Sequence, residues 1–268
     1  MGARDQALIL ATATLLLAAT AEAADESKEF GPFSVDRAVL TGLAGTLEVR
    51  IVESEETRLT VSGSADAVAA LDVEAAAGGL AVEAQPRGRS VTVVERVTVV
   101  TGSGASSNVV IGGGTTASAS SRIAADAALD VVLDVPSGTR LELRGFAGDA
   151  EIGDLAGPLA IEAIGGTVRT GAVTAAEFAA VGDGSIEAAS VEGDLTTRVT
   201  GAGRIVVEGG DVGALTVDVT GTGVVEIDAP AASAVVNMVG DGTVRLAEVA
   251  SEPVVNRVGT GRFSIGPG

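Results

Sequence analysis

A glycine-rich step, Gly-x-Gly in its clearest copies, recurs through the second half of the chain at a nearly constant interval. Successive steps are 18 to 20 residues apart when the second glycine of each is taken as the mark. The marks are Gly148, Gly166, Gly184, Gly203, Gly223, Gly242 and Gly261. A fixed period of this length is typical of repeat proteins, in which each repeat packs on the one before it.

The residues that follow each mark alternate between apolar and polar. Two positions after the marks stand Ala150, Val168, Ile186, Ile205, Val225, Val244 and Phe263. Four positions after them stand Ile152, Thr170, Ala188, Val207, Ile227, Leu246 and Ile265. The position between these two columns is mostly charged. A period of two predicts short strands with one buried face, and a second strand of the same kind precedes each mark.

These features predict an all-β chain, a right-handed parallel β-helix or β-solenoid with about 18–20 residues per coil. The glycines then mark a corner, where the chain needs positive φ or a backbone without a Cβ atom. The core must be built from small aliphatic side chains, because the sequence has five Phe and neither Trp nor Tyr. One coil cannot fold alone, since ordering 19 residues costs on the order of 20–40 kcal/mol, more than a few buried aliphatic side chains return.

Stacking in register also predicts which outward side chains become neighbours. Arg169 is expected between Glu151 and Glu187, and Arg245 beside Glu226. Cross-strand pairs of this kind contribute roughly 0.2–1 kcal/mol each. Two asparagines, Asn237 and Asn256, stand 19 residues apart and are expected to stack as a short hydrogen-bonded ladder.

The first half of the chain is less regular but still alternates apolar and polar residues. We expect strands within residues 39–53, 57–64, 70–84 and 129–145, forming degenerate leading coils. Residues 86–122 combine possible strands with a Ser/Gly-rich loop at about 101–122. No clear shift in composition divides the chain, so residues 30–268 are interpreted as a single β-solenoid domain.

The N-terminus has the pattern of a secretory signal. An apolar stretch from Ala7 to Ala19 leads to Ala21-Glu22-Ala23, so residues 1–23 are interpreted as a signal peptide and 24–29 as a short tail. An uncleaved anchor is the alternative, although the stretch is short for a bilayer span. No later segment is long and apolar enough to span. We therefore expect an exported protein, in the periplasm or at the cell surface.

The chain has no Cys and a formal charge of −19. The fold therefore depends on packing without disulfides, and no lipid can be attached to a cysteine. The acidic balance excludes nucleic acid as a partner, because phosphate backbones are repelled. Such a charge also keeps a repetitive β-protein soluble.

The repeats resemble those of the autotransporter adhesin head GIN domain family, a group of adhesin-like exported bacterial β-solenoids. The residues that carry the resemblance are "VGDGSIE", "VTGAGRIVV", "VTGTGVVEI", "VGDGTVRL" and "VGTGRFSI", together with the N-terminal run at 39–84 and "SNVVIGGG". The resemblance covers nearly all of the chain after residue 23. It implies an exported β-helix-like protein without an established enzymatic activity. The chain departs from a true autotransporter, since no series of amphipathic strands follows Gly268.

Enzymatic chemistry has few candidate residues here. With neither His nor Cys, the Ser-His-Asp and Cys-His arrangements and the usual zinc sites are excluded. Carboxylate pairs for glycoside cleavage are possible by residue type, and turn carboxylates could bind calcium. The carboxylates considered are Asp183, Asp211, Asp228 and Asp241, with Asp183 and Asp241 as the calcium candidates.

The glycine-rich segments 111–115 and 208–213 lack the Gly-Lys-Ser/Thr ending of a phosphate loop. We assign no catalytic, cofactor-binding or metal-binding residue and expect no enzyme.

Three functions remain open at this level. The first is a non-enzymatic adhesin-like or cell-envelope binding module with an unknown protein or glycan partner. The second is a periplasmic structural scaffold or spacer. Deletion of residues 101–122 should not change the function of such a scaffold. The third and least favoured is a calcium-dependent or carbohydrate-active β-helix enzyme.

Overall fold

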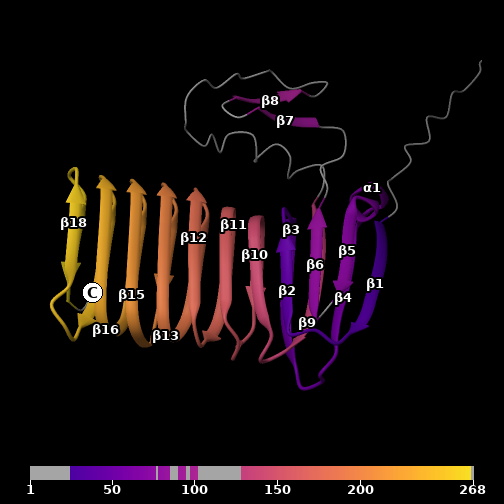
Figure 1. The fold of residues 1–268 in the computed structure, drawn as a ribbon, viewed down its shortest axis with the longest axis horizontal. Helices are drawn as coiled ribbons and strands as arrows, with labels where there is room; N and C mark the ends of the chain where they lie inside the picture. Colours follow the sequence, from indigo (N-terminus) through magenta and orange to yellow (C-terminus); the bar gives the residue numbers. More distant parts are fainter. Residues whose placement is uncertain (1–24, 77, 85–89, 95–96, 102–127, 267–268) are drawn as a thin grey trace, which may run out of the picture.

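The computed structural model describes residues 25–76, 78–84, 90–94, 97–101 and 128–266. Nineteen strands and one short helix form in this part, and 17 of the strands join in one continuous sheet. The sheet winds into a β-solenoid of about seven turns, and its strands lie side by side along the long axis of the molecule (Figure 1). The predicted fold class is confirmed.

The body of the solenoid runs from residue 140 to residue 265, and each of its strands pairs in parallel with strands of the neighbouring coils. Its strands are β10 (Arg140–Ile152), β11 (Leu159–Val173), β12 (Ala176–Gly182), β13 (Ser185–Gly201), β14 (Arg204–Val207), β15 (Gly210–Gly221), β16 (Val224–Gly240), β17 (Thr243–Val249), β18 (Val254–Val258) and β19 (Arg262–Ile265). The long strands continue around a bend and belong to two sides of the coil.

Each coil of the body has three sides. The segments that follow the glycine corners form the A side, for example 185–188 beside 204–207. The segments that precede the corners form the B side, for example 195–201 beside 215–221. A narrow third side is held by fewer pairs, such as Val173 with Val191.

The predicted columns coincide with the observed register. Val168 lies opposite Ile186, Ile186 opposite Ile205, and Ile205 opposite Val225. All four side chains are fully buried. In the last coil Phe263 is only partly buried. The core is a stack of aliphatic layers between the A and B sides.

The two glycines of a corner serve different needs. Gly221 has φ +116°, and a Cβ atom on it would lie 2.5 Å from the carbonyl oxygen of Gly201. Gly223 has an ordinary φ, but its Cβ would lie 2.2 Å from Cγ1 of Val199. The first position therefore needs the conformation and the second needs the space, as predicted for a corner.

The N-terminal region contains two further coils, but their order in space differs from their order in the chain. Strands β2 (Arg37–Thr41) and β3 (Ala44–Val52) form one coil, and β6 (Gly79–Ala84) and β9 (Leu129–Pro136) form the other. The β2/β3 coil pairs with β10 on one edge and with β6 and β9 on the other. It therefore lies between chain segments that follow it in sequence, as the indigo strands of Figure 1 show.

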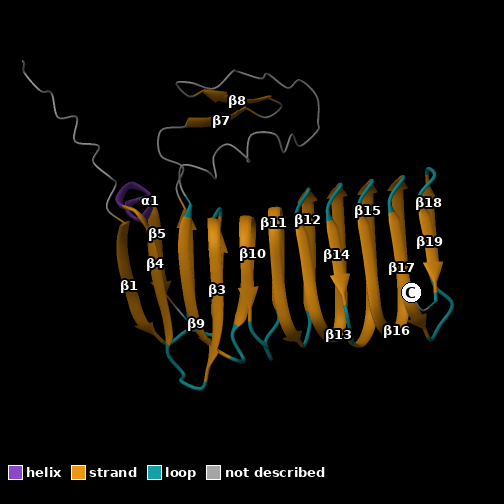
Figure 2. Cartoon of the chain, turned by 180° about the vertical axis from the view of Figure 1, so that it is seen from behind, coloured by secondary structure: helices purple, strands orange, loops and turns teal. Residues whose placement is uncertain are grey.

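Antiparallel strands end the stack on this side (Figure 2). They are β1 (Asp25–Phe33), β4 (Thr57–Ser64) and β5 (Leu71–Ala76). Strand β4 pairs with β9, β1 with β4, and β5 with β6. Helix α1 (Ala65–Ala69) begins at the N-cap Ser64 and contributes buried Ala67 and Val68. The antiparallel pairing was not predicted, and residues 25–29, expected to form a tail, are part of β1.

The corner of the β6/β9 coil contains a long insertion between residues 84 and 129. Within it, β7 (Ser90–Val94) and β8 (Val97–Thr101) form an antiparallel hairpin. The expected loop at about 101–122 lies almost wholly outside the described residues, as does the expected signal peptide at 1–23. Over the residues that the structure describes, no helix has the length and apolar character needed to cross a membrane.

Candidate binding face

The outer surface of the B side is a regular grid built from five successive strands. The residues on it occupy three columns, because alternate side chains of each strand point outward. From β12 to β18 the outer columns are Glu177, Thr196, Thr216, Val235, Val254 and Val181, Thr200, Thr220, Val239, Val258. The middle column is Ala179, Arg198, Asp218, Asn237, Asn256.

Side chains of the middle column are linked along the solenoid. Asn256 donates from Nδ2 to Oδ1 of Asn237 at 2.9 Å, and Asn237 donates to Oδ1 of Asp218 at 2.8 Å. Arg198 lies 3.7 Å from the Asp218 carboxylate. The predicted asparagine ladder is confirmed and is longer than predicted. These contacts hold the side chains of the middle column in place.

The two outer columns change from threonine to valine towards β18. The valines remain uncovered although they are apolar: Val239 is 51% exposed and Val258 is 68% exposed. Val235 and Val254, in the other outer column, are 39% and 55% exposed. An exposed apolar patch on a flat, hydrogen-bonded face is a common feature of binding surfaces.

Negative charge is concentrated on the third side rather than on the B-side grid. Its segments between residues 153 and 253 carry eight acidic residues and no basic one: Asp154, Glu192, Asp194, Glu208, Asp211, Asp228, Glu248 and Glu252. The B-side grid carries two acidic residues and one basic residue. A partner that approaches the B side therefore meets less of the repulsion that the chain's charge produces.

The outer surface of the A side carries charges of alternating sign. Arg169 forms the predicted ion pair with Glu187 at 3.0 Å. Arg245 lies beside Glu226 in the register, as predicted, but its ion pair at 3.0 Å is with Asp228. Glu226 instead pairs with Arg204.

The four aspartates considered for catalysis or calcium binding lie at separate places. Asp183 and Asp241 are at corners three coils apart, about 14 Å at the usual strand spacing. Asp241 accepts hydrogen bonds from the backbone and hydroxyl of Thr260, and Asp228 pairs with Arg245. Asp211 is exposed on the third side. No group of three or more Asp or Glu side chains suited to a metal occurs in the described ranges.

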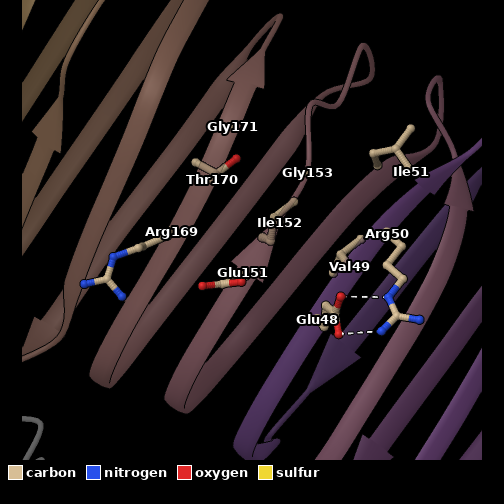
Figure 3. A pocket seen from close by; sticks show the side chains of 10 residues that line it. All are labelled: Glu48, Val49, Arg50, Ile51, Glu151, Ile152, Gly153, Arg169, Thr170 and Gly171. Atoms are coloured by element: carbon tan, nitrogen blue, oxygen red, sulfur yellow. Dashed lines mark hydrogen bonds and ion pairs between the residues drawn. The ribbon is translucent and has the colours of Figure 1, made fainter.

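A shallow depression of about 470 Å³ lies on the A side, at the junction of β3 with the body (Figure 3). It forms because β3 continues to Val52 while the chain after β10 turns away at Gly153. Its lining includes Glu48 and Glu151, which are register partners on adjacent strands. Local spacing could not reveal this pair, because Glu48 and Glu151 are 103 residues apart and belong to coils joined out of chain order.

The charges around the depression do not suit acid catalysis. Arg50 binds both carboxylate oxygens of Glu48, at 2.7 and 2.8 Å, and this hydrogen bonding lowers the pKa of Glu48. A general acid for glycoside cleavage needs a raised pKa. Glu48 is therefore not suited to that role.

Comparison with known proteins gives a likeness in fold only. No family model and no curated protein matches the chain. Among solved structures, a protein of Bacteroides fragilis named "putative adhesin" has a TM-score of 0.62 at 12% identity, covering 90% of this chain and 97% of that one. A "putative lipid binding protein" of Parabacteroides distasonis has a TM-score of 0.49 at 13% identity, covering 90% and 96%. A "putative adhesin" of Parabacteroides merdae has 0.48 at 11%, covering 90% and 95%. Membership of the head GIN domain family stays a prediction.

Proposed function

We propose that this chain is an exported, non-enzymatic binding module, adhesin-like in character, that contacts a protein or glycan partner at the cell envelope. The contact surface in this proposal is the B-side grid. The observation that carries it is a regular array of outward threonines and exposed valines, with a hydrogen-bonded ladder between them, on a strongly acidic molecule.

The physical support is preorganisation. Threonine and valine lose little rotamer freedom on binding, because β-branched side chains are already restricted at χ1. The ladder from Asp218 to Asn256 holds the polar groups of the middle column in place. A surface of this kind gives up less entropy on association than one built from long flexible side chains. The name of the Bacteroides fragilis protein agrees with this proposal by analogy of fold.

The test measures attachment to cell envelopes. Beads coated with the purified protein are allowed to settle on envelope fractions and are then washed under flow. Thr220→Lys with Val239→Lys changes the B side, and Ser185→Lys with Thr243→Lys makes the same charge change on the A side. We expect the B-side variant to lose most of the retained beads and the A-side variant to keep them. Equal retention of both variants and the unchanged protein would contradict the proposal.

Location separates this function from the scaffold alternative. Protease is added to intact cells that carry an internally tagged chain, and to cells with a permeabilised outer membrane. Digestion in intact cells agrees with a surface binding module. Protection until permeabilisation favours a periplasmic scaffold.

A further inference from the structure

Three arginines surround one buried carboxylate where the N-terminal coil meets the body. Glu142, on β10, is the one buried charged residue among those described, and its side chain is 9% exposed. Nη2 of Arg37 lies 2.6 Å from Oε1 of Glu142, and Nη2 of Arg144 lies 2.6 Å from Oε2. Nε of Arg140 lies 3.5 Å from Oε1. The cluster holds three positive charges against one negative charge.

This excess distinguishes the cluster from the other ion pairs of the described residues. Each of the other arginines with an ion pair there has a carboxylate partner of its own. The pairs are Arg50–Glu48, Arg58–Glu56, Arg169–Glu187, Arg198–Asp218, Arg204–Glu226 and Arg245–Asp228. The cluster therefore carries a local excess of positive charge on a chain whose formal charge is −19.

In this register the arginines repel one another, and a further anion would relieve that repulsion. Arg37 and Arg140 lie directly opposite each other on the parallel strands β2 and β10. Like charges in this position destabilise a sheet. The neighbours of Glu142 in the same row are Val39 and Ala160, so no second carboxylate stands beside it. Hydrogen bonding from Arg37 keeps the pKa of Glu142 below its usual range in spite of burial.

The nearby acids lie at the edge of the cluster. Asp36 precedes Arg37, and its carbonyl oxygen accepts from the backbone of Arg140. Glu83 is separated from Arg144 by Thr41 in the register. Glu162 lies on β11 within the bulge between Leu143 and Phe146, on the strand next to Arg144. Within the described residues, none of these three carboxylates forms an ion pair with the guanidinium groups, which remain half exposed at 49%, 60% and 57% for Arg37, Arg140 and Arg144.

We propose that this cluster, Arg37, Arg140 and Arg144 around Glu142, is a binding site for a phosphate group. Arg37 and Arg140 are register partners on neighbouring strands, and their guanidinium groups present N–H donors in planar forks, which match the oxygens of a tetrahedral anion. A phosphate group carries about −1.5 to −2 charge at neutral pH, which offsets the excess of the cluster. Glu142 holds the arginines from the buried side and does not contact the ligand.

The first experiment follows the arginine Nε signals by NMR while sodium phosphate is added to the full chain at fixed ionic strength. Sodium chloride serves as the matched titrant. We expect a saturable shift at Arg140 with phosphate alone. Arg140→Gln should weaken phosphate binding at least tenfold, whereas Glu142→Gln, which removes the inner negative charge, should strengthen it. Arg169→Gln removes an equally exposed arginine from the A side and should leave binding within twofold.

A melting curve confirms that each variant is folded, and Arg37→Gln replaces Arg140→Gln if that variant melts early. A response to phosphate no greater than the response to chloride would overturn the proposal. An equal loss of binding in Arg169→Gln would overturn it too, because the effect would then reflect net charge.

Vesicles identify where the phosphate group comes from. Vesicles of phosphatidylcholine with one fifth phosphatidic acid are floated with the protein, and pure phosphatidylcholine is the control. Flotation that Arg140→Gln abolishes assigns the site to a lipid headgroup. Saturable phosphate binding without flotation assigns it to a soluble phosphate compound. The absence of both responses refutes the site.

Discussion

The body of the solenoid and its N-terminal region use similar strands but join them differently. In the body, each strand lies parallel to its counterpart one repeat away, and the corners are glycines. In residues 25–136, parallel and antiparallel pairs coexist, and the β2/β3 coil lies between segments that follow it in the chain. The repeated sequence determines how one coil stacks on the next, whereas the antiparallel strands β1, β4 and β5 end the stack.

The physical difference lies in what covers the core. In the body, every aliphatic layer before the last coil is covered by the next coil. At the N-terminal end, β4 contributes buried Leu59 and Val61, and α1 contributes Val68. The antiparallel strands also use the backbone groups that the first coil would otherwise leave exposed, which limits association through the sheet edge.

The largest effect is expected from a charge placed inside the body. Val225 is fully buried between Ile205 and Val244. Val225→Asp should cost about 4 kcal/mol or more, because an unpaired carboxylate is taken out of water. Urea unfolding followed by circular dichroism should show a much lower midpoint. Val239→Asp, at an outward and half-exposed position, is the matched control, and an equal loss there would contradict the assignment of the inward face.

A smaller and more local effect is expected at the N-terminal end. Leu59→Ala should cost about 2–5 kcal/mol through the cavity it leaves. Hydrogen exchange should accelerate in β1, β4 and α1 while the body keeps its protection, because antiparallel elements can open without the stack. Leu215→Ala, an equally buried change in β15, should accelerate exchange in the body. Uniform acceleration by Leu59→Ala would show that the two regions unfold as one unit.

A third prediction compares a glycine at a corner of the body with a glycine in the link to the N-terminal region. Gly221→Ala should cost about 1–3 kcal/mol from its positive φ alone, with a further cost from the contact with Gly201. Gly138, in the link between β9 and β10, has no heavy atom within 4 Å of an added Cβ atom and no positive φ. Gly138→Ala should leave the melting temperature unchanged or slightly raised. Thermal unfolding of the two variants measures the difference.

The regular part of this fold could be predicted from the sequence because its information is local. The distance between Gly203 and Gly223 sets the coil, and the alternation around Ile205 sets the buried face. The antiparallel end could not be predicted in the same way. The segment around Leu59 alternates as a parallel strand would, and its direction depends on its partner in β9, Leu133, which lies 74 residues later.

The candidate sites also differ in whether local sequence spacing could predict them. The asparagine ladder was predictable because Asn237 and Asn256 are one period apart. The cluster around Glu142 was not, since Arg37 is 105 residues away and reaches it only through the reordered β2/β3 coil. The exposure of Val239 and Val258 also required the structure, because alternation alone does not show which face another element covers.

The smallest expected effect is a pH dependence at the junction of the two regions. Arg37 of the N-terminal coil holds the pKa of Glu142 in the body below its usual range. A carboxylate whose pKa is lowered by folding stabilises the protein above its unfolded pKa, and this contribution is lost as pH falls through the folded value. The melting temperature of the wild type should therefore fall more between pH 7 and pH 3 than that of Glu142→Gln. Parallel curves would mean that Glu142 does not couple the N-terminal coil to the body.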